Sequence, residues 1–293
     1  MRQWSLAASQ PPTYHDTIAV QSSSFINALA FIPPAGAYPD GLVVSAGKDT
    51  IIDVRAPGRS TTDNAERLLL GHANNICALD VGFNGDTVVS GGWDAQARVW
   101  NLENGNTAAE LKGHTAAVWA VLVYDENTIL TGCADKTIRA YSPSGKLLQT
   151  IPGLPDVVRA LCKVPPNHPS GAAFASAGND QVIRLWSQDG VEVAQLHGHE
   201  AFIYALAALP SGELVSSSED RTVRIWRGSE CIQTITHPAI SVWSVAVCKD
   251  TGDIVTGASD KIVRLFTRDP ERSADSEVRS FSFFSFPPSY IAC

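Results

Sequence analysis

The sequence lacks the features of a membrane-spanning, secreted or nucleic-acid-binding protein. It contains no run of about 18 apolar residues, which a membrane-spanning helix needs. Its first four residues lead into a polar stretch, so we expect no secretory signal. The net charge is −8 and no block of Lys and Arg occurs, whereas phosphate binding needs such blocks. We therefore expect neither a nucleic acid nor a membrane as partner.

Cysteine is also sparse, with six residues in 293 and no Cys-x-x-Cys pair. Five of the six fall in or beside expected strands. Zinc sites and disulfide frameworks use cysteines at short, regular spacings. We therefore expect reduced core residues of an intracellular protein, with no metal and no cofactor. Helical periodicity of useful length is absent as well, which favours an all-β fold.

A repeat dominates what the sequence does contain. Six aspartates recur every 40 to 45 residues, and each follows a Ser or Thr by four positions. The pairs are Ser45/Asp49, Ser90/Asp94, Thr131/Asp135, Ser176/Asp180, Ser216/Asp220 and Thr256/Asp260. A period near forty with four short apolar runs is typical of a β-propeller blade. A propeller usually binds other molecules rather than transforming them.

The repeat around Asp94 illustrates the four expected strands. They cover residues 66–70, 76–81, 87–90 and 96–100, and the turn at 103–106 is rich in Gly and Asn, as a hairpin requires. The strands are nearly all apolar, which favours sheets covered on both faces by neighbouring blades. Gly91 and Gly92 before Asp94 suit a tight backbone turn.

The repeats organise the whole chain. The units cover residues 17–55, 66–102, 107–142, 146–187, 191–227 and 230–267, and loops rich in Pro, Gly, Ser or Asn are expected at 33–40, 56–65 and 165–171. We therefore expect one propeller domain at 1–270, made of six sequence repeats plus a remnant ending at Trp4. Residues 271–293 are expected to be a tail, whose Phe-rich stretch 281–288 either patches an open blade edge or is non-native or disordered.

Three repeats carry a matching set of polar residues that fits the WD-repeat pattern. The sets are His72, Ser90, Asp94 and Trp100; His114, Thr131 and Asp135, with Tyr141 in the Trp place; and His199, Ser216, Asp220 and Trp226. We expect a buried relay in which the indole binds the hydroxyl, the hydroxyl binds the imidazole, and the imidazole binds the carboxylate. Each group would cost about 1–3 kcal/mol if it were buried unpaired.

A Ser–His–Asp set also invites a hydrolase reading. A hydrolase would have one set that differs from the rest and reacts with a serine-directed probe, whereas this chain has equivalent sets in three repeats. We therefore expect no catalytic residue and no enzyme. The other repeats lack the set: the first has no Gly-His, the fourth has Leu154, and the last has His237-Pro238 with Phe266 in the Trp place. Those blades are expected to be less rigid.

Several runs resemble the amino-terminal propeller of the phospholipase A-2-activating protein family. They are Ser-Gly-Gly-Trp-Asp at 90–94, Ala-Asp-Lys-Thr-Ile-Arg at 134–139, Asp-Val-Val-Arg at 156–159, Gly-His-Glu-Ala-Phe-Ile-Tyr at 198–204, Glu-Asp-Arg-Thr-Val-Arg-Ile-Trp at 219–226 and Pro-Ala-Ile-Ser-Val-Trp-Ser-Val at 238–245. The last is the most distinctive, because it replaces the ordinary Gly-His. The resemblance implies ubiquitin as partner, cytoplasmic and nuclear localisation, and recruitment of a ubiquitin-selective AAA ATPase only through carboxy-terminal domains that are absent here.

The resemblance also implies a seven-bladed WD-repeat β-propeller. Measured against that family, the first blade is expected to be mostly missing, reduced to residues 2–4 and 17–21. Five complete blades should follow, and then a last blade of three strands, at about 241–267, without its closing strand.

In a propeller, three positions per blade point to the narrow top face: the residue before the turn Asp and two at the start of the innermost strand. The candidates before the Asp are Lys48, Trp93, Ala134, Asn179, Glu219 and Ser259. The inner-strand candidates are Phe25, Asn27, Asn75, Cys77, Ala117, Trp119, Val157, Arg159, Phe202, Tyr204, Ser241 and Trp243. Aromatic residues and Arg dominate interface energetics, so this rim is the expected binding site.

The aromatic residues of the rim are expected to cover the small apolar patch of ubiquitin. Glu219 and Asp156 are expected to face the basic residues that surround this patch. The alternative is that some rings, Trp119 and Trp243 above all, only plug the central channel. A second functional reading is a general WD-repeat interaction scaffold, such as a ligase substrate receptor or a trafficking component, and only the family-like runs separate the two.

Overall fold

The computed structural model describes residues 3–4, 14–15, 25–34, 39–57, 65–82, 84–268, 281–282 and 290–291. All regular elements in these ranges are strands. Accordingly, no helix of the described chain has the length and apolar character needed to cross a membrane. The all-β propeller expected from the repeat is confirmed.

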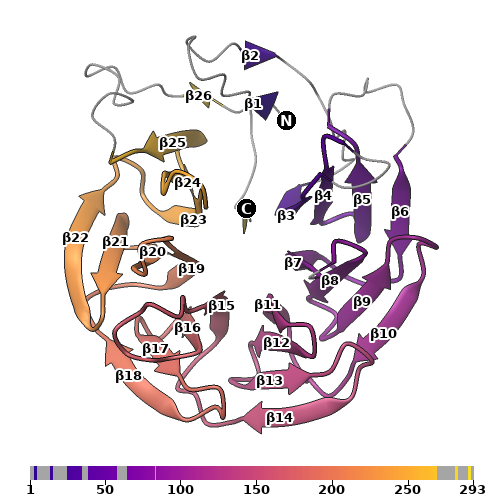
Figure 1. Cartoon of the computed structure of the whole chain (residues 1–293), viewed down its shortest axis with the longest axis horizontal. Coiled ribbons are helices and arrows are strands. Elements are labelled where there is room, and N and C mark those ends of the chain that lie inside the picture. The colour runs from indigo at the N-terminus through magenta and orange to yellow at the C-terminus, as the bar shows by residue number, and fades with distance from the viewer. Residues whose placement is uncertain are drawn as a thin grey trace.

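Six sheets of four or more strands stand side by side around a central axis and form blades 1 to 6 (Figure 1). Blade 1 comprises β3 (Ile26–Ile32), β4 (Leu42–Gly47), β5 (Ile51–Arg55) and β6 (Arg67–Leu70). Blade 2 comprises β7 (Ile76–Val81), β8 (Thr87–Gly92), β9 (Ala97–Asn101) and β10 (Thr107–Leu111). Blade 3 comprises β11 (Val118–Asp125), β12 (Thr128–Cys133), β13 (Ile138–Tyr141) and β14 (Leu147–Ile151).

Blade 4 comprises β15 (Val158–Lys163), β16 (Phe174–Gly178), β17 (Ile183–Trp186) and β18 (Glu192–Leu196). Blade 5 comprises β19 (Ile203–Ala208), β20 (Leu214–Ser218), β21 (Thr222–Arg227) and β22 (Glu230–Thr236). Blade 6 comprises β23 (Val242–Val247), β24 (Ile254–Ala258), β25 (Ile262–Phe266) and the short β26 (Phe281–Ser282). In each blade the strands run outward from the axis in chain order, so the short turns between them make antiparallel pairs (Figure 1).

The two ends of the chain lie at the junction between blades 6 and 1. β26 pairs with β25 only at Ile262 and Val263, so the last blade is closed over two residues. This pairing corresponds to the edge-patching alternative for the tail, whereas residues 271–280 and 283–289 lie outside the described ones. β27 (Tyr290–Ile291) pairs in parallel with β3 and also contacts β23.

The expected remnant of an additional blade is only partly described. β1 (Gln3–Trp4) pairs with β2 (Tyr14–His15), a segment that the sequence analysis did not assign to a strand. Residues 17–21, which were expected to complete the remnant, lie outside the described residues. In Figure 1 the two-stranded sheet lies in the gap between β25 and β4. Within the described ranges there are five complete blades and a sixth with a short fourth strand.

The glycines before the turn aspartates serve a different purpose from the one expected. Gly91 does not have a positive φ, and a Cβ added to it would lie 2.9 Å from the Val118 side chain of the next blade. A Cβ on Gly132 would lie 2.6 Å from the Val158 side chain. These glycines therefore permit close approach of neighbouring blades. The left-handed backbone of the turn falls one residue after the Asp, at Thr50, Ala95, Lys136, Gln181, Arg221 and Lys261.

Blades 2 and 5 contain the complete buried relay. In blade 2, Trp100 Nε1 donates to Ser90 Oγ over 2.8 Å, and the distance from Ser90 Oγ to His72 Nε2 is 2.7 Å. His72 Nδ1 lies 2.8 Å from Asp94 Oδ2. Blade 5 repeats this geometry with Trp226, Ser216, His199 and Asp220, at 2.8, 2.7 and 2.6 Å. In blade 3, the Tyr141 hydroxyl donates instead to the Lys112 carbonyl over 2.9 Å, while His114 binds Thr131 and Asp135.

The imidazoles of His72 and His114 act as neutral donors and acceptors. Burial lowers the pKa of His72 and of His114, although the neighbouring aspartates oppose this effect. Burial would raise the pKa of Asp135, but hydrogen bonds from Thr137 and His114 outweigh it and lower the pKa to about 2. The hydroxyl proton therefore points to Nε2, and the Nδ1 proton points to the carboxylate, so the hydroxyl, the imidazole and the carboxylate of these relays are all paired.

Blades 4 and 6 give their turn Asp a different partner. Asp180 forms an ion pair with Arg184, and Asp260 with Arg264, whose Nη2 lies 2.6 Å from Oδ2. Each arginine lies four residues after its aspartate, on the next strand of the same blade. The aspartates of these blades are thus anchored although the relay histidine is missing or displaced. Whether the blades are less rigid remains a prediction.

Ser217 is expected to weaken the fold, because its buried hydroxyl has no hydrogen-bond partner in the part of the chain that the structure describes. Ala46 and Ala177 occupy the same pairing position in blades 1 and 4. We expect Ser217→Ala to stabilise the domain by about 1 kcal/mol in urea unfolding. The adjacent Ser216→Ala is the control: it leaves His199 and Trp226 without their shared partner and should cost about 3 kcal/mol. Destabilisation by both variants to the same degree would contradict this interpretation.

His237 in blade 6 is expected to make stability depend on pH. Among the described residues its Nδ1 atom has no hydrogen-bond partner, and burial together with the Arg264 charge lowers its pKa from the ordinary value of 6.5 to about 4. Between pH 6.5 and about 4, His237 therefore binds a proton in the unfolded chain but not in the folded one. Above pH 6.5 His237 is neutral in both states and does not reduce the free energy of unfolding. As the pH falls from 6.5 to about 4, protonation of the unfolded chain lowers the free energy of unfolding by about 3 kcal/mol.

The variant His237→Leu copies Leu154, which precedes the innermost strand of blade 4. The melting temperature of this variant should decrease less between pH 6.5 and 4 than that of the unaltered chain. The control variant His197→Gln changes an exposed histidine and should leave the loss unchanged. An unaltered pH profile of His237→Leu would exclude His237 as a source of the acid sensitivity.

Candidate functional site

A β-bulge opens the innermost strand of every blade. In all six, the strand pairing shifts by one residue between the first and third positions. A bulge leaves one residue out of the ladder and re-aims its side chain. The residues released in this way are Asn27, Cys77, Trp119, Arg159, Tyr204 and Trp243. All six were among the sequence candidates for the top face, and the bulge is the physical reason that they project from the strand.

The released side chains reach toward the next blade. Asn27 Nδ2 donates to the Ile76 carbonyl over 3.0 Å, and Cys77 Sγ donates to the Val118 carbonyl over 3.0 Å. Both acceptors are the first residues of a neighbouring innermost strand. Contacts on this face therefore join blades to one another.

One backbone hydrogen bond brings the three candidate positions of each blade together. The backbone N–H of the residue before the turn Asp donates to the carbonyl of the residue that directly precedes the innermost strand. In blade 2, for example, Trp93 N donates to Asn75 O over 2.8 Å, and in blade 5 Glu219 N donates to Phe202 O over 2.9 Å. The equivalent bonds start at Lys48, Ala134, Asn179 and Ser259. The three positions chosen from the sequence are thus neighbours in space.

Five candidates from blades 2 to 5 form one group, here called the aromatic surface: Trp93, Trp119, Arg159, Phe202 and Tyr204. The Trp93 and Trp119 rings lie 5.5 Å apart between centroids. The Arg159 guanidinium lies 4.6 Å from the Trp119 centroid, 5.6 Å from that of Tyr204 and 5.8 Å from that of Phe202. Trp93 is 45% exposed and the other four side chains are half-buried, so the group is open to a partner.

Two polar candidates flank the aromatic surface. Asn179 Oδ1 accepts a hydrogen bond from Arg159 Nε. Glu219 is exposed and lies beside Tyr204, whose pKa is raised by burial and by the Glu219 carboxylate. The rim therefore carries an acidic group next to the rings.

The remaining candidates lie in other blades. In blade 1, Lys48 Nζ is 5.8 Å from the centroid of Phe25, which is 39% exposed. Trp243 is half-buried at the start of β23 in blade 6. Among the described residues, no ring or cation contact links these three to the aromatic surface. The structure thus separates the aromatic surface from Phe25, Lys48 and Trp243, which lie in blades 1 and 6.

The sequence reasoning missed Ile240. Its side chain is 79% exposed in the loop between β22 and β23, directly before Ser241. Only three positions per blade were considered, and Ile240 is none of them. The available signal was the distinctive Pro-Ala-Ile-Ser-Val-Trp run at 238–243, which places an aliphatic residue in a loop that elsewhere contains Gly-His.

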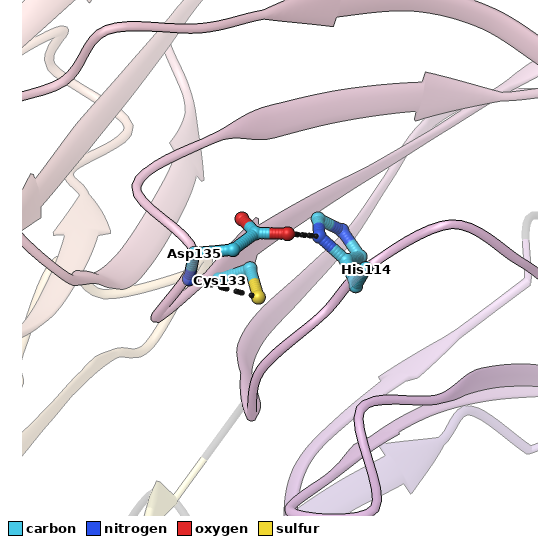
Figure 2. A group of neighbouring side chains, drawn as sticks. All are labelled: His114, Cys133 and Asp135. Carbon is cyan, nitrogen blue, oxygen red and sulfur yellow. Dashed lines mark hydrogen bonds and ion pairs between the residues drawn. The ribbon is translucent and has the colours of Figure 1, made fainter.

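A cluster in blade 3 has the composition of a metal site. His114, Cys133 and Asp135 offer ligand atoms that all lie within 4.8 Å of one another (Figure 2). The relay already occupies both imidazole nitrogens, through Asp135 and Thr131. Burial raises the pKa of the Cys133 thiol to about 12, so the thiol stays protonated and donates to the Ala116 carbonyl over 3.1 Å.

Blade 5 shows that Cys133 has a structural role. Ser218 occupies the same pairing position, donates to the Ala201 carbonyl over 3.3 Å and accepts from Asp220 N over 3.1 Å. Cys133 makes the same two contacts, with Ala116 O and Asp135 N. The cluster is therefore explained by a repeated turn and not by metal coordination.

Comparison with known proteins places these repeats in a family. The family model described as "WD domain, G-beta repeat" matches residues 64–101, 105–142, 145–187, 190–227 and 229–267. The chain is 41% identical over 256 residues to the ubiquitin homeostasis protein lub1 of Schizosaccharomyces pombe. It is 40% identical over 262 residues to the phospholipase A-2-activating protein of Xenopus laevis.

A solved structure, the WD40 beta propeller domain of Doa1, superposes with a TM-score of 0.80 at 35% identity. The match covers 94% of this chain and 88% of that one. The two relatives match 87% and 88% of this chain but only 34% and 31% of their own lengths. Most of each relative therefore lies outside the match.

Cys133→Ser tests the structural role of the cluster. Serine can make the two contacts that Ser218 makes, so we expect unfolding free energy to change by less than about 1 kcal/mol. Zinc chloride should not raise the melting temperature of the unaltered chain, since a ligand that binds only the folded state would raise it. A zinc-dependent rise that disappears in Cys133→Ser would identify a metal site after all.

Proposed function

Because the chain belongs to the WD-repeat family, and within it to the propellers of the phospholipase A-2-activating protein and Doa1 type, we propose that it is a ubiquitin-binding adaptor. The adaptor acts without catalysis in ubiquitin homeostasis and in ubiquitin-dependent protein catabolism. The Schizosaccharomyces pombe relative is a ubiquitin homeostasis protein, which supports this assignment.

The aromatic surface is the observation that carries the proposal. It combines four aromatic side chains and one Arg, the residue types enriched at interaction hot spots. Trp93 is exposed although it is large and apolar, and clustered exposed apolar groups mark partner sites. Ile240 adds further exposed apolar area on blade 6.

The proposed contact pairs the apolar rings of this chain with an apolar patch of ubiquitin, and acidic residues of this chain with basic residues of ubiquitin. The rings cover the apolar patch of ubiquitin, and Glu219 with Asp156 faces the basic residues around that patch. Glu219 is exposed and Asp156 is half-buried in the loop before β15. The net charge of −8 favours a basic partner surface through long-range steering.

The absence of catalysis is part of the proposal. Ser90, Thr131 and Ser216, the hydroxyls of the three relay sets, are each 0% exposed. A nucleophile must be within reach of its substrate, and these hydroxyls are enclosed between blades. Their hydrogen bonds support a structural role.

Other partners and the location rest on the family resemblance alone. We propose no contact between the propeller and the AAA ATPase, which the resemblance assigns to other segments. Cytoplasmic and nuclear localisation is likewise proposed on that basis. The second candidate function is a general interaction scaffold, which is favoured by the match of five repeats to a family model that specifies no partner. Capture by immobilised ubiquitin distinguishes the two functions.

The double variant Trp93→Ala, Phe202→Ala tests the proposed site. Removing two rings of the aromatic surface should weaken ubiquitin binding at least about tenfold, because hot-spot aromatics each contribute about 1–2 kcal/mol. Isothermal titration calorimetry measures the affinity, and circular dichroism should show that the fold is retained. Chemical-shift mapping on labelled ubiquitin identifies the face that responds.

The matched control is Leu147→Ala, Leu148→Ala on the outer strand β14. These side chains are 45% and 51% exposed, so the control removes comparable exposed apolar area away from the site. Its affinity for ubiquitin should equal that of the unaltered chain. Equal affinities of all three proteins would remove the aromatic surface from the ubiquitin site, and no binding by any of them would refute the proposed function.

A further inference from the structure

Three rings surround the Arg159 side chain and form a box. Trp119 comes from blade 3, Phe202 precedes blade 5, and Tyr204 lies on β19 of that blade. Their centroids lie 4.6, 5.8 and 5.6 Å from the guanidinium carbon. All three distances are within the range of about 6 Å over which a cation is attracted to an aromatic face. The box is thus occupied by a cation from the chain itself.

Two polar groups complete the surroundings of the guanidinium. Asn179 accepts a hydrogen bond from Arg159 Nε and fixes the side chain from its own blade. The Glu219 carboxylate lies beside the Tyr204 hydroxyl. The box therefore combines aromatic faces with an acidic rim, which is the composition that binds organic cations.

We propose that Arg159 determines the partner class of this surface by filling the box. With Arg159 in place, the rings present a closed, mostly apolar surface that suits an apolar patch on a protein. Without it, the same three rings and the Glu219 carboxylate would form a site for a quaternary ammonium or a methylated lysine side chain. Arg159 thus excludes one class of ligand, as specificity often requires.

The repeat positions support this interpretation. Arg159 lies at the bulge position of β15, where the other blades have Asn27, Cys77, Trp119, Tyr204 and Trp243. Among these it is the only cation, and it lies between two blades that both present rings to it. The charge of Arg159 is engaged by these rings and by Asn179, so its role is to position and fill rather than to form a salt bridge with a partner.

The test uses the whole chain and tetramethylammonium chloride as probe, with sodium chloride at equal ionic strength as reference. The variants Arg159→Ala and Arg159→Ser empty the box. We expect saturable quenching of tryptophan fluorescence in both, with an apparent affinity at least about tenfold above that of the unaltered chain. Circular dichroism melting identifies which of the two variants is folded and can be used.

Two controls separate an emptied box from a general effect. Arg159→Met refills the space with an uncharged chain of similar length, so it should gain no affinity for tetramethylammonium. In Arg159→Ala, Trp119→Ala the nearest ring is removed, and the gained affinity should disappear. The proposal is supported if the folded Arg159→Ala or Arg159→Ser variant binds tetramethylammonium saturably and neither control variant gains affinity for it. The absence of binding by these variants, or equal binding by Arg159→Met, overturns it.

A second measurement concerns the protein partner, and this arm rests on the proposed function. Affinity for ubiquitin should fall at least about fivefold in Arg159→Ala, and Arg159→Met should recover part of the loss because it supports the rings. An undiminished affinity in Arg159→Ala would overturn this part. If the unaltered chain does not bind ubiquitin, the proposed function fails while the tetramethylammonium titration still decides whether Arg159 closes the box.

Discussion

Close packing of the innermost strands of neighbouring blades is the constraint on which the rest of this structure depends. A single four-stranded sheet of this size leaves both of its faces apolar, and only contact with the next blade covers them. Small residues make the contact possible: a side chain on Gly91 or Gly132 would collide with Val118 or Val158 of the next blade. The close approach of neighbouring blades therefore requires glycine at positions 91 and 132.

The same packing encloses polar groups, and the chain satisfies them in two ways. In blades 2, 3 and 5 a histidine connects the buried hydroxyl to the turn aspartate. In blades 4 and 6 an arginine on the following strand binds the aspartate. Both solutions hold the turn that carries one of the candidate site residues, so the relay positions the backbone of the proposed binding surface.

The proposed binding surface is built by several blades together. A bulge at the start of each innermost strand releases one side chain toward the next blade, and the turn residue is fixed to the same region by a backbone hydrogen bond. Because this happens in every blade, the identity of the surface depends only on which residues occupy the repeated positions. Rings from blades 3 and 5 lie around Arg159 of blade 4, and Trp93 of blade 2 adds a ring beside Trp119.

The sequence by itself determined the repeat, the all-β propeller, the relay partners of blades 2 and 5 and the three neighbouring candidate positions of each blade. These features depend on local spacing, since a hydrogen bond between fixed positions of one blade recurs wherever the spacing recurs. Tertiary structure alone decided that Tyr141 binds the Lys112 carbonyl, that arginine replaces histidine beside Asp180, that Ile240 is exposed, and that three rings enclose Arg159. Those outcomes depend on the direction of each side chain and on contacts across a blade boundary between residues about one repeat apart. The periodicity of the sequence specifies neither of these.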